Sequence, residues 1–297
     1  MVSKQMTRMM KAIGKTFHSG DDMVEVWRKG LDTITAALVL PKDVKTESFD
    51  IRGVPAQWIN TPETIHKRVL YFLHGGGHVS GSIKTHQDFA ARLSRISKAR
   101  VLLIDYRLAP EHPFPAGLDD AVKAYKWLVD DEQIDPKNII IGGDSAGGNL
   151  ALTTLLKLRE LNLELPKSAV LISPWTDMLG TGESMITKAE VDPFISPIAC
   201  EFFSQLYARD RDLRNPLISP LYADLQGFPP LFIQVGTAEI LLDDSIRLAK
   251  RAKAIGIEVE LDVWEDMIHD FAMFAAVVPE SQEGIINIGK FLLKHFS

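Results

Sequence analysis

Apolar runs alternate with amphipathic stretches along most of the chain after residue 60. Short continuous runs rich in Val, Ile and Leu predict strands at Val69–Leu73, Val101–Ile104, Ile139–Ile141, Ala169–Ile172, Leu231–Val235 and Glu258–Val263. Apolar residues at helical spacing predict helices at Gln87–Ser97, Ala116–Asp130, Ala146–Leu161, Asp244–Ile255 and Glu280–His295. Because strands that are apolar on both sides must be covered on both sides, this alternation indicates a mostly parallel sheet between two layers of helices.

Two shorter stretches, Lys45–Ile51 and Val54–Asn60, alternate between polar and apolar residues. Such alternation is typical of strands that have one solvated face. These stretches predict an antiparallel pair at one edge of the sheet, which brings the expected number of strands to eight.

Two regions depart from this rhythm. Residues 1–40 are expected to be helical, in two or three segments broken around Ser19-Gly20-Asp21-Asp22. Apolar residues at helical spacing near the N-terminus indicate an amphipathic helix docked on the protein, with a transit peptide or a surface-seeking helix as the alternatives. Between Ile172 and Leu231 the alternation stops, and residues 180–215 are expected to form a helical insertion in a main domain of residues 41–297.

Composition narrows the class of protein. The 297 residues, 46% of them hydrophobic, suffice for one large α/β domain with an insertion or for two small domains. A net charge of −6 without a long basic run makes nucleic-acid binding unfavourable. The single Cys200 excludes an internal disulfide framework. No segment approaches the ~18 apolar residues of a membrane span and the N-terminus lacks secretory-signal features, so we expect a cytoplasmic protein.

A glycine-rich turn follows the strand predicted at Ile139–Ile141, and it reads Gly142-Gly143-Asp144-Ser145-Ala146-Gly147-Gly148. A serine flanked by glycines fits a tight strand-to-helix turn, where a Cβ would crowd the neighbouring backbone. The turn holds the hydroxyl of Ser145 exposed at the carboxyl end of the strand. Because Gly-x-Ser-x-Gly also recurs by chance, Ser145 becomes a candidate nucleophile only if the chain supplies its partners.

A nucleophilic serine needs an imidazole to remove its proton, and the imidazole needs a carboxylate to fix its tautomer. In doubly wound hydrolases the acid and then the histidine follow the serine along the chain. Of the eight histidines, only His269 and His295 follow Ser145. His295 falls in the last turn of a terminal helix and is expected to be solvated or to complement the helix dipole. His269 follows the last predicted strand, at the same edge of the sheet as Ser145, and is the expected base.

The acid is expected just after the strand Leu231–Val235. Glu239 comes first and is the preferred candidate. Asp243 and Asp244 lie about one turn further on and could instead cap the following helix. Whether Asp243 assists or replaces Glu239 stays open at the level of sequence.

Three consecutive glycines, Gly75, Gly76 and Gly77, follow the first of the six apolar runs. They let the backbone approach a substrate closely and turn its N–H groups toward a developing oxyanion. Ala146, directly after the candidate nucleophile, would supply another N–H. A phosphate-binding loop is the alternative, but residues 82–83 lack the required Lys-Ser/Thr and no dinucleotide fingerprint is present. No motif with metal-ligand spacing occurs either, so neither a metal nor a cofactor is expected.

With these residues in hand, the chain resembles the hormone-sensitive-lipase-like esterases of the α/β-hydrolase fold. Three motifs carry the resemblance in the family's order, and they are His74-Gly75-Gly76-Gly77, Asp105–Glu111 with Phe114-Pro115-Ala116, and Gly143–Asn149. It spans roughly residues 65–275 and is greatest to small bacterial and metagenome-derived esterases. The family usually carries Asp where this chain has Glu239.

The resemblance implies an α/β-hydrolase fold, with a mostly parallel eight-stranded sheet, helices on both faces and a helical cap. The cap would consist of residues 1–40 and 180–215. Short acyl esters would be the substrates, without a metal, and Gly76, Gly77 and Ala146 would donate to the oxyanion, with Gly75 as a further candidate. We expect the acyl pocket to be lined by Phe194, Ile195 and Leu206.

Several polar residues beside these motifs are expected to be structural. His74 would pin the glycine loop by hydrogen bonding. Asp105 and its neighbours, crowded by prolines, would fix a turn, and Asp144 would cap a helix or make a structural contact. Cys200 is expected to pack within the cap rather than to act as a reactive thiol.

The sequence therefore predicts a carboxylesterase for short- to medium-chain acyl esters, with Ser145, His269 and Glu239 as its triad and an acyl-enzyme intermediate. A lactonase, amidase or acyltransferase would use the same nucleophile. A non-catalytic small-molecule receptor on this fold is the alternative from another class, although such proteins typically lose a triad member. An edge strand of the sheet could also pair across a homodimer.

Overall fold

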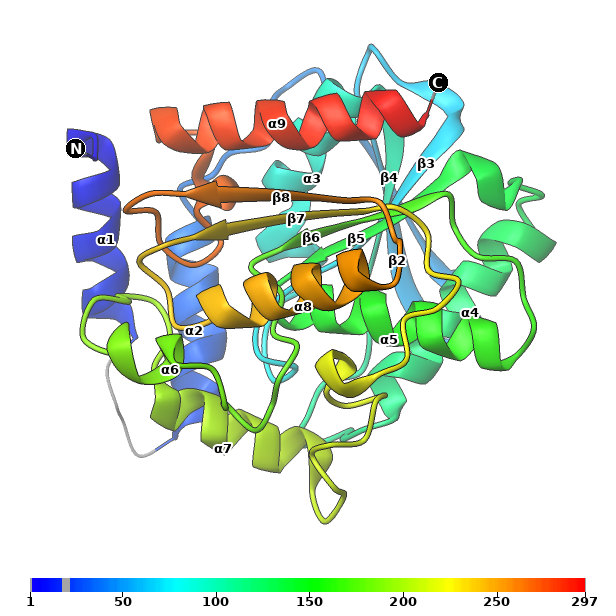
Figure 1. The fold of residues 1–297 in the computed structure, drawn as a ribbon. Helices are drawn as coiled ribbons and strands as arrows, with labels where there is room; N and C mark the ends of the chain where they lie inside the picture. The colour runs from blue at the N-terminus through cyan, green and yellow to red at the C-terminus, as the bar shows by residue number, and fades with distance from the viewer. Residues whose placement is uncertain (1, 18–21, 297) are drawn as a thin grey trace.

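The computed structural model describes residues 2–17 and 22–296, and one eight-stranded sheet forms its centre (Figure 1). The strands are β1 (Lys45–Ile51), β2 (Val54–Asn60), β3 (Ile65–Leu73), β4 (Ala99–Ile104), β5 (Ile139–Asp144), β6 (Ser168–Ile172), β7 (Leu231–Gly236) and β8 (Val259–Trp264). They lie in the order β1-β2-β4-β3-β5-β6-β7-β8. Strand β2 is antiparallel to β1 and β4, and the other neighbouring pairs are parallel, which confirms the predicted sheet and its antiparallel edge.

Helices cover both faces of the sheet. The helices that flank it are α3 (Ile83–Ser97), α4 (Ala116–Asp130), α5 (Ala146–Glu160), α8 (Leu242–Ala254) and α9 (Pro279–His295). Side chains along β3 point alternately to the two faces, so Leu70 and Phe72 join the cluster formed with α3 and α9. Tyr71 and Leu73 join the opposite cluster, formed with α4, α5 and α8. This two-sided burial explains why the buried parts of the central strands consist mainly of apolar residues.

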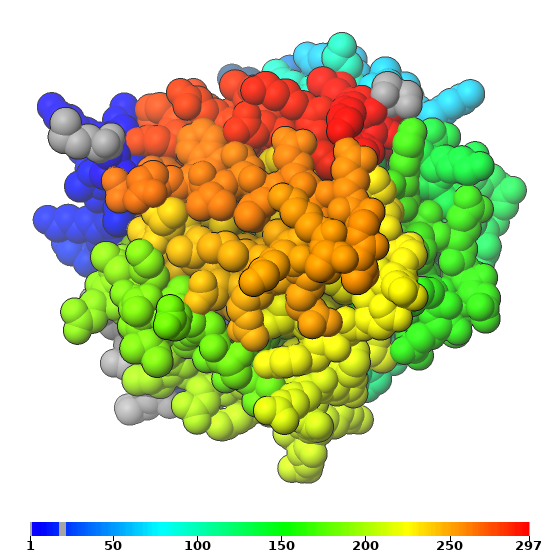
Figure 2. Space-filling model, in the orientation of Figure 1, coloured from blue at the N-terminus to red at the C-terminus, as the bar shows by residue number. Residues whose placement is uncertain are grey.

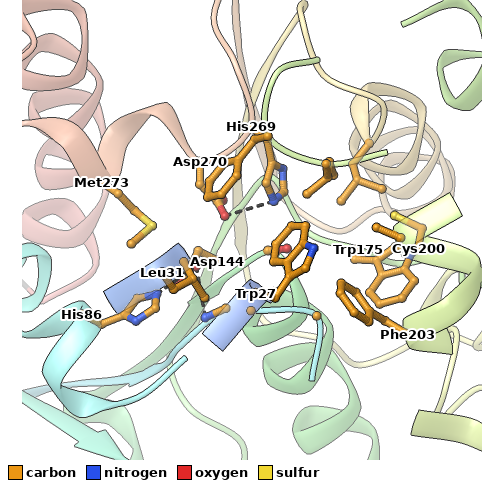
Figure 3. A pocket seen from close by; sticks show the side chains of 18 residues that line it. Trp27, Leu31, His86, Asp144, Trp175, Cys200, Phe203, His269, Asp270 and Met273 are labelled. Carbon is orange, nitrogen blue, oxygen red and sulfur yellow. Dashed lines mark hydrogen bonds and ion pairs between the residues drawn. The ribbon is translucent and has the colours of Figure 1, made fainter. Parts of the chain in front are cut away.

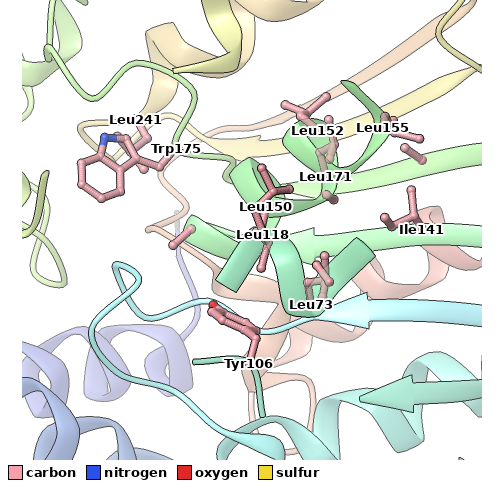
Figure 4. Close-up of a cluster of buried hydrophobic side chains, with 14 of the residues drawn as sticks. Leu73, Tyr106, Leu118, Ile141, Leu150, Leu152, Leu155, Leu171, Trp175 and Leu241 are labelled. Atoms are coloured by element: carbon pink, nitrogen blue, oxygen red, sulfur yellow. The ribbon is translucent and has the colours of Figure 1, made fainter. Parts of the chain in front are cut away.

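The cluster on the α5 face is mainly aliphatic (Figure 4). Leu150 and Leu155 of α5 belong to it together with Ile141 of β5 and Leu171 of β6, and all four are fully buried. Each such side chain contributes about 1.5–3 kcal/mol relative to an exposed one. Helix α5 is thus held firmly against the strand that precedes it, and the turn between them is held as well.

Helix α3 begins at Ile83, four residues before the start predicted at Gln87. Ser82 is its N-cap and forms a capping box with Thr85, in which Ser82 Oγ accepts from Thr85 N–H (3.3 Å) and Thr85 Oγ1 accepts from Ser82 N–H (2.9 Å). The first turn is polar, so apolar spacing alone places the start too late.

The remaining helices gather at one end of the sheet. They are α1 (Lys4–Thr16), α2 (Met23–Thr35), α6 (Ser184–Thr187) and α7 (Pro197–Ala208). Short 3₁₀ helices lie in the connections, at Pro136–Asn138 directly before β5, at Pro220–Tyr222 and at Phe271–Phe274. Met6 and Ile13 of α1 are fully buried, which confirms the docked amphipathic helix. The break predicted at Ser19–Asp22 falls between α1 and α2, although residues 18–21 lie outside the described residues. Of the helices described, none is long and apolar enough to cross a membrane.

Strand order determines where the loops meet. Strands β3, β5, β6, β7 and β8 are consecutive neighbours and parallel, so the loops after them emerge at one edge. The arrowheads of β7 and β8 point toward α1 and α2 (Figure 1). In the space-filling view, the N-terminal helices and the segment of α6 and α7 occupy the left and lower left of the molecule (Figure 2). The candidate residues lie between this layer and the sheet.

Candidate functional site

Ser145 stands on the turn between β5 and α5. Its φ of 51° and ψ of −119° lie in a region that non-glycine residues rarely adopt. A Cβ on Gly143 would collide with the backbone of Gly147, and a Cβ on Gly147 would collide with the backbone at the end of β3. The Ser145 N–H donates to Ile172 O (2.8 Å), and Ser145 O accepts from Trp175 N–H (3.0 Å). The two glycines are required as the motif predicts, and the end of β6 holds the turn in place.

His269 and Glu239 meet from two different loops at this edge of the sheet. The distance between Glu239 Oε2 and His269 Nδ1 is 2.8 Å, and the side chains are 0% and 2% exposed, respectively. Glu239 Oε1 accepts from the N–H of Gly236 (2.8 Å) and from the hydroxyl of Ser173 (2.7 Å). A carboxylate held in this way can accept a hydrogen bond from the Nδ1–H of the imidazole, which leaves Nε2 as the basic nitrogen.

The two aspartates after Glu239 make other contacts. Asp243 Oδ2 accepts from Ser184 N–H (2.9 Å), and Asp243 N–H donates to Ser184 Oγ (3.0 Å), which ties α8 to α6. Asp244 Oδ2 accepts from two backbone N–H groups of the loop after β6, at 2.7 and 2.8 Å. Neither aspartate is a hydrogen-bond partner of His269, so the geometry favours Glu239 where the sequence left the choice open.

The glycine loop after β3 lies beside Ser145. The N–H of Gly75 donates to Asp144 Oδ2 (3.1 Å), so Gly75 is not a free donor for an oxyanion. Gly76 and Gly77 have φ angles of 116° and 64°, and no acceptor among the described residues takes their N–H groups. Ala146 begins α5, where a backbone N–H lacks an intrahelical acceptor. The donors that remain are Gly76, Gly77 and Ala146.

A cavity joins these elements (Figure 3). Its lining contains Ser145, His269 and the three glycines. The apolar part of the lining includes Trp27, Leu31, Phe194, Ile195, Phe203 and Leu241. In Figure 3 the side chains of Trp175, Cys200 and Phe203 lie on one side of the cavity, and those of His86 and Met273 lie on the other. The cavity therefore has a wide apolar wall and a smaller polar region beside His269.

Two of the three residues expected to line an acyl pocket do line this cavity, namely Phe194 and Ile195. Leu206 is not among the residues that line it. It lies on α7 about one turn beyond Phe203, where it is half-buried against the hydrophobic core. Cys200 lies in the lining, and burial raises the pKa of its thiol, which fits the predicted packing role.

Ser173, which no sequence motif marks, supports both Glu239 and the histidine loop. Its hydroxyl donates to Glu239 and accepts from the N–H of Asp270 (3.2 Å). It is fully buried at the end of β6, with a φ of 42°. Sequence patterns cannot single out this serine, because its two partners lie far away along the chain.

Asp192 was also missed, and it links the cavity lining to the loop that carries Glu239. Its Oδ1 accepts from the N–H groups of Phe194 (2.8 Å) and Ile195 (3.1 Å), and its Oδ2 accepts from Ile240 N–H (2.9 Å). Burial raises the pKa of Asp192 to about 6. The Asp-Pro pair in the sequence is a turn signal that could have drawn attention to it.

Asp270 is the third residue absent from the sequence-based site, and it touches the imidazole itself. Its Oδ2 lies 3.1 Å from His269 Nε2. Burial by itself lowers the pKa of His269, but Asp270 and Glu239 outweigh it and raise this pKa well above the usual value. The local balance of charge thus favours the imidazolium.

His74 and His295 make structural contacts. His74 Nδ1 donates to Gly75 O (2.8 Å), as expected of a residue that pins the glycine loop, and burial lowers its pKa to about 3. His295 is 7% exposed and its ring centroid lies 4.2 Å from that of Phe291, so its side chain is not solvated. Its place in the last turn of α9 agrees with the other expectation, that it complements the helix dipole. Helix α9 lies flat on the sheet, and its last turn is therefore covered.

Asp105 and Asp144 also make the structural contacts expected of them. Asp105 Oδ1 accepts from Ile83 N–H (2.6 Å) at the start of α3. Asp144 joins the glycine loop to His86, whose Nε2 lies 3.2 Å from Asp144 Oδ2. Among residues 2–17 and 22–296, no group of three His, Cys, Asp or Glu side chains is arranged to hold a metal ion.

Comparison with known proteins agrees with this geometry. The family model described as the alpha/beta hydrolase fold matches residues 70–273. The chain is 34% identical to an acetyl-hydrolase from Streptomyces hygroscopicus, over 98% of this chain and 97% of the relative. It is 36% identical to an esterase from Acinetobacter venetianus, over 89% of this chain and 87% of the relative.

Solved structures extend the similarity to the whole chain. An esterase from the bacterial hormone-sensitive lipase family superposes with a TM-score of 0.96 at 42% identity, covering 99% of both chains. EstE5, in a crystal soaked with p-nitrophenyl butyrate, superposes with a TM-score of 0.93 at 38% identity, again over 99% of both chains. The chain therefore belongs to the bacterial hormone-sensitive lipase family of α/β hydrolases and is a carboxylic ester hydrolase.

Proposed function

We propose that this esterase hydrolyses short- to medium-chain acyl esters with Ser145 as nucleophile, His269 as base and Glu239 as the acid that orients the base. The observation that carries the proposal is the 2.8 Å contact between Glu239 Oε2 and His269 Nδ1, in a cavity that also contains Ser145. With the proton of a neutral imidazole on Nδ1, its Nε2 can accept the proton of a hydroxyl.

In this mechanism His269 Nε2 takes the hydroxyl proton while Ser145 Oγ bonds to the carbonyl carbon of the ester. The carbonyl oxygen becomes an oxyanion, which the N–H groups of Gly76, Gly77 and Ala146 stabilise. As this intermediate collapses, His269 gives the proton to the leaving alcohol and the acyl group stays on Ser145. A water molecule, deprotonated by His269, then attacks the acyl carbon. The bond from this carbon to Ser145 Oγ breaks, His269 returns the proton to Ser145 Oγ, and the carboxylic acid leaves.

The acyl chain would lie against aromatic rings that close the cavity. Trp27 and Phe194 are nearly parallel, with centroids 6.1 Å apart, and Trp27 meets Phe203 edge-on at 5.1 Å. We assign these rings to a cap composed of residues 1–40 and 180–215. A cavity closed by large side chains favours short to medium acyl groups, which agrees with the acetyl-hydrolase relative and with the butyrate ester soaked into EstE5.

Replacement of the nucleophile tests the proposal. Ser145→Ala is expected to lower kcat for p-nitrophenyl acetate or butyrate by about 10⁴-fold or more, because the acyl-enzyme can no longer form. Ser48→Ala, at an exposed position on β1, is the matched control and is expected to keep full activity. Circular dichroism and the thermal midpoint check that both variants fold. Turnover near the wild-type rate by Ser145→Ala would refute the mechanism.

A series of p-nitrophenyl esters from C2 to C12 tests the proposed chain length. We expect kcat/KM to be greatest for short to medium chains and to fall for the long ones. Undiminished activity at C12 would contradict the argument from the closed cavity. Formation of an organophosphate adduct at Ser145, detected by mass spectrometry, would separate this enzyme from a binding protein of the same fold.

A further inference from the structure

Both ring nitrogens of His269 lie against carboxylates. Nδ1 is 2.8 Å from Glu239 Oε2, and Nε2 is 3.1 Å from Asp270 Oδ2, the contact drawn as a dashed line in Figure 3. Asp270 follows His269 directly, and its side chain is 4% exposed. The carboxylate of Asp270 is therefore buried beside the imidazole of His269 and is not a surface charge.

This contact competes with the proposed chemistry. The Nε2 atom must be free to accept the proton of the Ser145 hydroxyl. An ionised carboxylate only accepts hydrogen bonds, so a hydrogen bond between ionised Asp270 and Nε2 needs a proton on that nitrogen. With Nδ1 also donating to Glu239, the ring is then an imidazolium and cannot act as a base.

The backbone holds Asp270 in this position. Its N–H donates to the hydroxyl of Ser173, and its φ of 52° is left-handed. Asp270 Oδ1 has no hydrogen-bond partner among the described residues, so contact with His269 is the interaction that engages this carboxylate.

Four titratable groups from other elements face this pair. They are His86 from α3, Asp144 at the end of β5, Glu239 after β7 and Asp192 before α7. Burial and the charge of Asp144 raise the pKa of Asp270, while the positive charge of His269 opposes this change. Burial lowers the pKa of His269, but Asp270 and Glu239 raise it by more.

We propose, building on the function proposed above, that Asp270 is a positioning residue that holds His269 Nε2 in the enzyme without substrate. The charge of Asp270 thereby sets the pH above which His269 becomes available as the base. An imidazolium between two carboxylates loses its proton at a higher pH than one that has a single acidic partner. The rising limb of kcat/KM against pH reports this ionisation in the free enzyme. Removal of the Asp270 charge should therefore move the limb to lower pH.

The variant Asp270→Asn tests this directly. Asparagine keeps the shape of the side chain and tolerates a left-handed backbone, so the loop can stay in place. A single opposite charge at this distance changes a pKa by about 1–3. In kcat/KM profiles for p-nitrophenyl acetate from pH 5 to 9, we expect the rising limb to move down by about one pH unit or more. On the acidic side, activity relative to the plateau would then rise about tenfold for each pH unit by which the limb moves.

Asp266→Asn is the matched control. It removes the same charge from the same loop, but Asp266 is exposed and is not a partner of His269. Its profile should coincide with that of the wild type. If Asp270→Asn does not fold, Asp270→Gly removes the carboxylate at a backbone angle that glycine adopts freely, and the same displacement of the limb is expected.

Two results would overturn the inference. One is a lowered plateau with an unmoved limb in the Asp270 variants, because a purely structural role would produce only that. The other is an equal displacement in Asp266→Asn, which would assign the effect to net charge. Ser145→Ala, measured alongside, keeps the two proposals apart. If Ser145→Ala loses activity and the rising limb of Asp270→Asn does not move, only this inference is rejected. If Ser145→Ala retains activity, the proposed mechanism itself is rejected.

Discussion

Replacement of Glu239 by glutamine offers a sharp test of the proposed triad, because the surrounding hydrogen bonds determine which way the amide must face. Glu239 Oε1 accepts from Gly236 N–H at 2.8 Å and from the Ser173 hydroxyl at 2.7 Å. The Gly236 N–H can only donate, so the amide oxygen of the introduced glutamine must stay on that side. Its NH₂ group then faces His269 Nδ1.

An amide turned the other way would leave the buried Gly236 N–H without an acceptor, at a cost of about 1–3 kcal/mol. In the favoured orientation His269 Nδ1 must accept a hydrogen bond, so the proton of the neutral ring moves to Nε2. That tautomer cannot take the proton of Ser145. The equivalent carboxylate-to-amide change in a Ser-His-Asp triad lowers kcat about 10⁴-fold, which corresponds to about 5.5 kcal/mol of transition-state stabilisation.

We therefore expect Glu239→Gln to lower kcat for p-nitrophenyl butyrate by about 10³- to 10⁴-fold, with KM changed by much less. Asp243→Asn is the matched control, since Asp243 bonds to Ser184 rather than to His269, and it should stay within a few-fold of the wild type. Thermal midpoints of both variants check the fold. A Glu239→Gln enzyme within tenfold of the wild type, or an Asp243→Asn enzyme with the larger loss, would refute the assignment of the acid.

Two further variants test other contacts. Ser173→Ala removes a buried hydrogen bond to a carboxylate and should lower kcat about 10- to 100-fold, less than Glu239→Gln; a loss as large as that of Glu239→Gln would show that Ser173 does more than hold the acid. Trp27→Ala removes one of the two aromatic rings, with Phe194, that line both the catalytic cavity and a second pocket beside it, and should move the best acyl length in the p-nitrophenyl series to a longer chain. An unchanged chain-length profile would mean that another side chain closes the pocket.

The residues of the site that sequence predicted are those that carry a local signal. Gly143 and Gly147 flank Ser145 because the turn leaves no room for a Cβ, and such a constraint is visible in any window of five residues. His269 was found by its order along the chain and by its place after a strand. Where the signal was weak, the prediction matched the structure less well, as with Leu206, which lies on α7 but is not among the residues that line the cavity.

By itself, the sequence determined the sheet, its edge pair and the end of the sheet at which Ser145 and His269 emerge. These follow from the period of apolar residues and from steric limits on the backbone, which act between near neighbours. Only the tertiary structure decided the hydrogen bonds and ion pairs that orient Glu239 and His269. Ser173 reaches Asp270 across 97 residues of chain, and Glu239 reaches His269 across 30. Hydrogen bonds and charges act through space over a few ångströms, so they depend on which loops the strand order brings together.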